Sequence, residues 1–112
     1  MAKVIITIAL REEIFRHFKS DSEDIILRMM ALESHPAQGK AVGHISGVVI
    51  KELKLGTYRF YFITDGYILK FGSPQDLAML LIKFVRMSEK KDQQRAINEI
   101  KLVLKSLGME GF

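Results

Sequence analysis

The sequence of 112 residues contains no cysteine, no tryptophan and only two prolines. Without cysteine, the chain has no disulfide framework, no thiolate zinc ligand and no cysteine nucleophile. Long hydrophobic runs are absent as well, since the apolar run near the N-terminus, Val4–Leu10, is interrupted by Thr7 and closed by Arg11. Such a run is too short to cross a membrane, and no small-residue cleavage site follows it. We therefore expect a cytoplasmic protein that makes no membrane contact.

The composition is typical of one folded domain. Hydrophobic residues make up 48% of the chain and charged residues 27%. These proportions are typical of a globular protein and exclude a disordered one. A chain of this length has enough residues for one ordinary core but not for two. We therefore expect a single domain over residues 1–112.

The positive charge is concentrated in the second part of the chain. The formal net charge is +4, and residues 1–47 contain six basic and six acidic side chains, which cancel. The whole excess therefore lies in residues 48–112. An excess of this sign suggests a nucleic acid, an acidic protein or another polyanion as the partner.

Hydrophobic periodicity predicts an N-terminal strand followed by a helical hairpin. Lys3–Ala9 is β-branched and almost entirely apolar, as in a strand that is covered on both faces. Apolar residues then recur every fourth position over 10–18, which predicts a helix. A second helix is expected at about Glu23–Ser34, with Asp21 or Ser22 as its N-cap.

The sheet is expected in the second half of the chain. Ala37–Gly47 has no periodicity and is expected to be a loop, whereas Asp65-Gly66 is typical of a hairpin turn. A last helix is expected to begin at Ser88 or Asp92 and to end at Gly108. The predicted strands are Val48–Leu55, Tyr58–Thr64, Tyr67–Phe71 and the extended apolar run Leu77–Met87. This order predicts an α+β fold with a small, mainly antiparallel sheet, an N-terminal strand, a helical hairpin and a C-terminal helix.

Strand alternation predicts that several cations share one face of the sheet. Aromatic residues at 58, 60 and 62 form the expected core row, which leaves Arg59 and Tyr61 on the opposite, concave or solvent-exposed face. Lys54 and Glu52 are expected beside them, whereas Lys51 alternates onto the core side. On the last strand, either alternating row contains one cation, so its orientation is left open.

Cations on rigid strands beside a tyrosine suit an RNA ligand. Arginine binds phosphate in a bidentate manner, tyrosine stacks on bases, and fixed cations stabilise the charge that develops on phosphate during cleavage. The alternative to an RNA-binding site is that these cations are ordinary solvent-exposed charges without a ligand. Metal-ligand spacing is absent, and neither a metal nor another cofactor is expected. The catalytic candidates are Arg59, Lys54, Arg86 and Tyr61, and the RNA-binding candidates are Lys51, Lys83, Lys90 and Lys91.

These strands resemble a known family. Glu52-Leu53-Lys54, Tyr58-Arg59-Phe60-Tyr61 and Phe84-Val85-Arg86-Met87-Ser88-x-Lys90, before a C-terminal helix, are similar to the RelE/ParE toxin superfamily, especially its HigB-like, phage-derived branch. The resemblance in element order covers nearly the whole chain. It implies a RelE-like fold and the toxin of a type II toxin–antitoxin pair, with a cognate antitoxin as partner. Nuclease members cut mRNA on the ribosome without a metal, whereas ParE-type relatives poison DNA gyrase. Lys54, Arg59, Arg86 and Lys90 occupy the basic positions of the family motif.

Departures from the family pattern leave the activity open. Met87 replaces a second basic residue, Lys91-Asp92 replaces Thr-Pro, and the last helix contains no His or Tyr. Asp65–Ala78 is also longer than the usual hairpin. The chain is thus predicted to be either a ribosome-dependent mRNA endonuclease or, on the same fold, a non-catalytic binding module or gyrase poison. A third interpretation is an oligomerising domain, for example a homodimer, that uses Leu77–Val85 as an exposed apolar surface.

Overall fold

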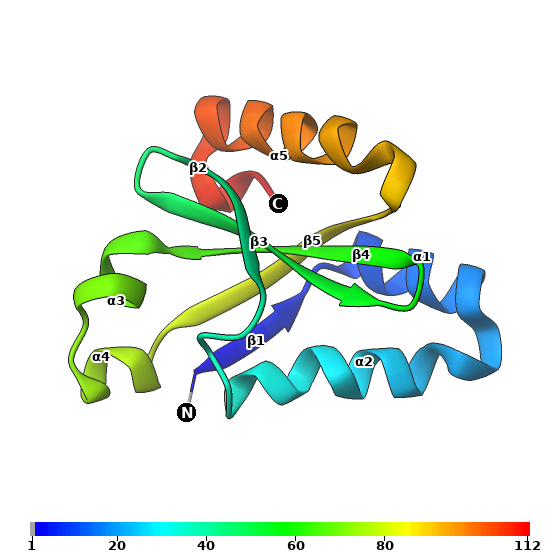
Figure 1. Cartoon of the computed structure of the whole chain (residues 1–112), viewed down its shortest axis with the longest axis horizontal. Coiled ribbons are helices and arrows are strands. Elements are labelled where there is room, and N and C mark those ends of the chain that lie inside the picture. Colours follow the sequence, from blue (N-terminus) through cyan, green and yellow to red (C-terminus); the bar gives the residue numbers. More distant parts are fainter. Residues whose placement is uncertain (1) are drawn as a thin grey trace.

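A computed structural model describes residues 2–112 as a five-stranded sheet with helices on both faces (Figure 1). The strand order is β1-β5-β4-β3-β2, with β1 parallel to β5 and all other neighbours antiparallel. The predicted α+β class, mainly antiparallel sheet and C-terminal helix are confirmed. The strands are β1 (Lys3–Ile6), β2 (Lys40–Ile45), β3 (Val48–Leu55), β4 (Tyr58–Asp65) and β5 (Leu81–Glu89). The α-helices are α1 (Ile8–Phe18), α2 (Ser22–Met30), α3 (Gly66–Phe71), α4 (Pro74–Ala78) and α5 (Gln93–Leu107).

The sheet is buried on both faces, so the domain has two apolar clusters. Phe60, Phe62 and Phe84 pack with the helical hairpin α1–α2 on one face. Tyr61 and Ile63 pack with α5 on the other face, which Figure 1 shows above the sheet. The expectation that Arg59 and Tyr61 lie on an open face is therefore wrong, because α5 covers that face. This double burial makes β4 a central strand, with every residue from Arg59 to Thr64 buried.

The N-terminal half differs from the sequence prediction mainly at the element ends. β1 ends at Ile6 rather than at position 9, because the Thr7 hydroxyl accepts a hydrogen bond from the Leu10 backbone N–H (3.3 Å) and caps α1. The helical hairpin is present, and Asp21 occupies the N-cap position of α2, as expected. Asp21 makes no capping bond, and the buried Ser22 hydroxyl instead donates to the Ile14 carbonyl at 3.1 Å.

Residues 37–47 contain a strand where a loop was expected. β2 pairs antiparallel with β3, with an irregularity between Ala41 and Gly43. A side chain at Gly43 would place its Cβ 3.0 Å from the Cε of Lys101 on α5. Because that atom is near the end of a flexible lysine side chain, this approach alone does not require a glycine here.

Asp65-Gly66 begins a helix instead of closing a hairpin. The Asp65 carboxylate accepts a hydrogen bond from the Ile68 N–H (2.9 Å), so it acts as the N-cap of α3, and the predicted strand Tyr67–Phe71 is helical. The predicted apolar surface Leu77–Val85 is also wrong, since its strand residues Ile82, Phe84 and Val85 are buried. Within residues 2–112, no helix is long and apolar enough to cross a membrane.

Candidate functional site

Two clefts share Lys54 and Arg59 beside the β3–β4 turn. The larger, of about 410 Å³, also contains Lys40 and Glu52, and the smaller, of about 210 Å³, also contains Lys90. We call these clefts together the basic groove, with Lys40, Lys54, Arg59 and Lys90 as its cations and Glu52 as its carboxylate. Lys40, Lys54 and Lys90 are exposed, and no ion pair forms at these three side chains within residues 2–112. The groove therefore presents a local excess of positive charge.

Strand pairing brings these residues together. Lys54 lies directly opposite Arg59 in the β3–β4 hairpin, which turns at Gly56-Thr57, and Glu52 lies opposite Tyr61. The shared face that alternation predicts for these side chains is confirmed. Lys90 arrives from the other side of β4, because it follows directly on β5, whose end pairs with the start of β4. The cations of the groove are thus carried by β2, β3, β4 and the turn before α5.

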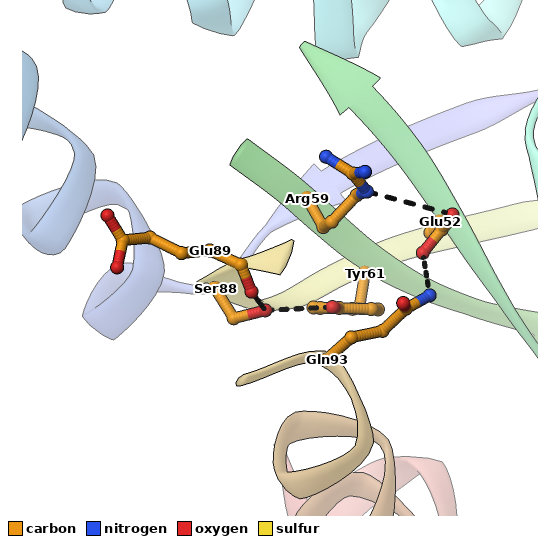
Figure 2. A network of polar contacts seen from close by, with 6 residues as sticks. All are labelled: Glu52, Arg59, Tyr61, Ser88, Glu89 and Gln93. Atoms are coloured by element: carbon orange, nitrogen blue, oxygen red, sulfur yellow. Dashed lines mark hydrogen bonds and ion pairs between the residues drawn. The ribbon is translucent and has the colours of Figure 1, made fainter. Parts of the chain in front are cut away.

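Arg59 and Glu52 form a buried polar network with the start of α5 (Figure 2). Their side chains are only 8% and 9% exposed. The Nε of Arg59 lies 3.9 Å from Oε1 of Glu52, which is an ion pair but longer than a hydrogen bond. Gln93, the first residue of α5, donates from Nε2 to the other oxygen, Oε2, at 2.6 Å.

The terminal nitrogens of Arg59 are open to the groove. Within residues 2–112, neither of them has a hydrogen-bond or ion-pair partner, and the only partner of the guanidinium is Glu52 through Nε. No described side-chain nitrogen or oxygen is both fully buried and unpaired. The two terminal nitrogens therefore keep contact with solvent, although the rest of the Arg59 side chain is buried. A buried stem holds this planar fork of donors in one place, which is a geometry that suits bidentate binding of a phosphate or carboxylate.

Tyr61 lies beneath α5 and not in the groove. Its hydroxyl forms a hydrogen bond with the Ser88 hydroxyl (2.8 Å), which in turn donates to the Glu89 carbonyl (2.9 Å). The ring is fully buried. Burial raises the pKa of Tyr61, and nearby Glu52 adds to this more weakly, against lowering contributions from the Ser88 hydrogen bond and Arg59. Because its ring is buried, Tyr61 cannot stack on a base. Because its hydroxyl is protonated and bonded to Ser88, it is not suited to accept a proton at neutral pH.

An irregularity in β5 settles the strand orientation that alternation left open. Phe62 pairs with Phe84 and Tyr61 with Arg86, so Val85 is an extra residue and the alternation shifts there. Arg86 consequently lies on the α5 side, as Tyr61 does. It does not line the groove: its Nη1 donates to the Val85 carbonyl (3.0 Å), its Nε is 4.0 Å from Glu99, and its guanidinium lies 5.2 Å from the Phe112 ring centroid.

Three of the predicted RNA-binding lysines also lie outside the groove. Lys51 is buried on the opposite face, where its ammonium donates to the Ala37 carbonyl (2.9 Å) and desolvation lowers its pKa. Lys83 donates to the Phe112 carbonyl at 2.6 Å and thus holds the C-terminal segment. Lys91 is exposed and lines neither cleft of the groove; its ammonium forms an ion pair with Glu89 at 3.5 Å.

The groove thus contains three of the eight predicted residues, together with residues that the sequence did not indicate. Lys54, Arg59 and Lys90 come together as expected. Lys40 was missed because β2 was interpreted as a loop. Alternation places Glu52 beside Arg59 but does not indicate a role for it. The contact between Gln93 and Glu52 depends on how α5 packs, and the sequence contains no local signal for that packing.

A third cleft, of about 410 Å³, lies between α1 and α5 and has the opposite charge. At its rim, His17 Nε2 and the Tyr58 hydroxyl are 2.6 Å apart. Its carboxylates disfavour an anionic ligand. They are Glu13, Glu89, Asp92 and Glu99. Within residues 2–112, no cluster of His, Asp or Glu has the arrangement of a metal site.

No family model, curated protein or solved structure matches the chain. The resemblance to the RelE/ParE superfamily consequently depends on the motif residues and the element order alone.

Proposed function

We propose that this protein binds single-stranded RNA in the basic groove and acts on mRNA at the ribosome as the toxin of a type II toxin–antitoxin pair. The observation that carries the proposal is the open, fixed fork of Arg59 between the exposed cations Lys54 and Lys90. Rigid donors of this kind bind phosphate without first being ordered, so little conformational entropy is lost on binding.

The lining of the groove favours a polyanion over a small apolar ligand. Pockets for small molecules are mostly apolar and enclosed, whereas the basic groove combines four cations with one carboxylate and two small clefts side by side. The spread of its cations over neighbouring elements matches a ligand with repeated phosphates. Single-stranded nucleic acid is such a ligand, and grooves of positive charge that follow its backbone are common in proteins that bind it.

The toxin assignment is supported by the motif residues that meet in the groove. Lys54, Arg59 and Lys90 are three of the positions that resemble the superfamily. Lys90 lies far from the other two in sequence, but all three line one cleft. A cytoplasmic location and a cognate antitoxin belong to the same proposal. An antitoxin with an acidic segment would neutralise these cations and compete with RNA for the groove.

The burial of Tyr61 favours binding without cleavage. Cleavage of RNA needs a base for the 2′-hydroxyl and an acid for the leaving oxygen. Tyr61 is engaged with Ser88, and Glu52 is the only carboxylate of the groove, held by Gln93. Endonuclease activity is the second candidate, and the observation that favours it is the Arg59 fork, which is placed to stabilise charge on a phosphate.

Cell-free translation with the purified protein tests the proposal. We expect the wild type to inhibit translation and the double variant Lys54→Gln/Lys90→Gln to lose this effect. The matched control is Lys3→Gln/Lys105→Gln, which removes the same charge from exposed lysines outside the groove. Inhibition that is equal in the groove variant and the control, or no inhibition by the wild type, would contradict the proposal.

Primer extension on the same reactions separates the two candidates. Intact message in inhibited reactions supports binding without cleavage. New 5′ ends that appear only on translated message, and disappear with the groove variant, identify a ribosome-dependent endonuclease.

A further inference from the structure

The carboxylate of Glu52 lies between two competing donors. Oε2 accepts a short hydrogen bond of 2.6 Å from Gln93, whereas Oε1 is 3.9 Å from the Nε of Arg59 (Figure 2). Glu52 and Arg59 both line the groove, and their side chains are more than nine-tenths buried.

This geometry is not the one that a buried carboxylate and guanidinium adopt when they meet without a competitor. Such pairs are commonly bidentate, with two parallel N–H···O bonds of about 2.7–2.9 Å. Here the contact is longer, involves only Nε and leaves both terminal nitrogens of Arg59 without a protein partner. The other carboxylate oxygen, Oε2, accepts the hydrogen bond from Gln93 at the start of α5.

We propose that Gln93 is a positioning residue that holds Glu52 away from the Arg59 fork and thereby keeps the groove open to anions. This inference depends on the proposed function, since the anion concerned is an RNA phosphate. Without Gln93, the Glu52 carboxylate turns toward Arg59 and pairs with its terminal nitrogens. The phosphate then has to compete with an intramolecular carboxylate for the same donors, and the affinity of the groove falls.

The start of α5 is built to hold Gln93 in this position. Gln93 follows directly on the 3-10 turn Lys90–Asp92, which also carries the groove lysine Lys90. One turn further along α5, Ala96 and Ile97 are buried against the sheet. The same packing therefore positions the backbone at both Gln93 and Lys90.

RNA binding by a set of single and double variants tests the role of Gln93. We expect Gln93→Ala to weaken binding of a single-stranded RNA oligonucleotide about tenfold, as when one charge-assisted contact is lost. Glu52→Gln is expected to bind at least as tightly as the wild type. In the Glu52→Gln background, Gln93→Ala is expected to have no effect, because no carboxylate remains to close the fork.

The matched control is Gln94→Ala, which removes the neighbouring exposed amide that bonds to Asn98 instead (2.9 Å). Binding by this variant should equal that of the wild type. Two results would overturn the inference: wild-type affinity in Gln93→Ala, or the same loss in both Glu52 backgrounds, which would indicate direct contact of Gln93 with RNA.

Nuclear magnetic resonance of the free proteins tests the pairing without any ligand. In the wild type, the protons on the terminal nitrogens of Arg59 should exchange rapidly with water, whereas in Gln93→Ala the restraint by Glu52 should slow this exchange. If the wild type does not bind RNA but Arg59 is restrained by Glu52 in Gln93→Ala, the proposed function is refuted, whereas the role of Gln93 in preventing the Arg59–Glu52 pairing stands. Equally rapid exchange of these protons in Gln93→Ala would refute the role of Gln93 itself.

Discussion

Removal of the two exposed groove lysines should change the salt dependence of RNA binding in a way that the structure specifies. Lys54 and Lys90 flank the Arg59 fork, and no ion pair forms at either lysine within the described residues. Their replacement by glutamine should leave the fold unchanged, because both side chains are exposed. The variant Lys54→Gln/Lys90→Gln therefore reports on ligand contacts rather than on stability.

The magnitude follows from the number of cations in the groove. Each phosphate that a cation neutralises on a single strand adds about 0.7 to the slope of log Kd against log salt concentration. The groove contains four cations, which gives a slope of about 2.8 for the wild type and about 1.4 for the double variant. Between about 50 and about 200 mM salt, wild-type affinity should fall roughly 50-fold and that of the variant roughly sevenfold.

Fluorescence anisotropy with a labelled single-stranded RNA at several salt concentrations measures both slopes. The control Lys3→Gln/Lys105→Gln lowers the net charge equally, so its slope should remain that of the wild type. The reasoning is refuted if the groove variant keeps the wild-type slope, or if the control loses as much slope as the groove variant does.

Three further predictions concern the buried groups around the groove. Arg59→Ala should lower the free energy of unfolding by about 3 kcal/mol, because it leaves the buried Glu52 carboxylate without its cation; addition of Glu52→Gln should recover part of this loss in thermal denaturation. Lys51→Met should raise the stability at neutral pH. Burial lowers the pKa of Lys51, so between that lowered value and the ordinary 10.5 the unfolded chain binds more protons than the folded one. The free energy of unfolding of the wild type should therefore rise with pH in this window. Denaturant titrations of the variant should show no such rise. Tyr61→Phe should cost about 1 kcal/mol through the lost hydrogen bond to Ser88 yet leave RNA affinity unchanged, and a loss of affinity would show that the hydroxyl does contact the ligand.

The central hairpin was predictable from the sequence because its signals are local. Val48–Leu55 and Tyr58–Asp65 alternate regularly around the Gly56-Thr57 turn, and this alternation alone placed Lys54 beside Arg59. The amphipathic stripe of α5 was equally clear, and Gly108, with φ of +70°, ends that helix as expected.

The errors arose where tertiary packing determines the local structure. Asp65-Gly66 is compatible with a tight turn and with a helix N-cap, and only the buried neighbours of the segment that follows decide between them. The extra residue Val85 has no sequence signature, so the orientation of Arg86 was not predictable from alternation. The burial of Tyr61 likewise depends on where α5 packs, which periodicity does not specify.

The most direct test of the central claim is a titration of the isotopically labelled protein with a single-stranded RNA oligonucleotide, followed by nuclear magnetic resonance. We predict that the largest shift changes occur at the Arg59 side-chain Nε and at the backbone amides of Lys54, Thr57 and Lys90. Changes confined to the acidic cleft around His17, or no saturable changes at low salt, would contradict the assignment of the basic groove as an RNA-binding site.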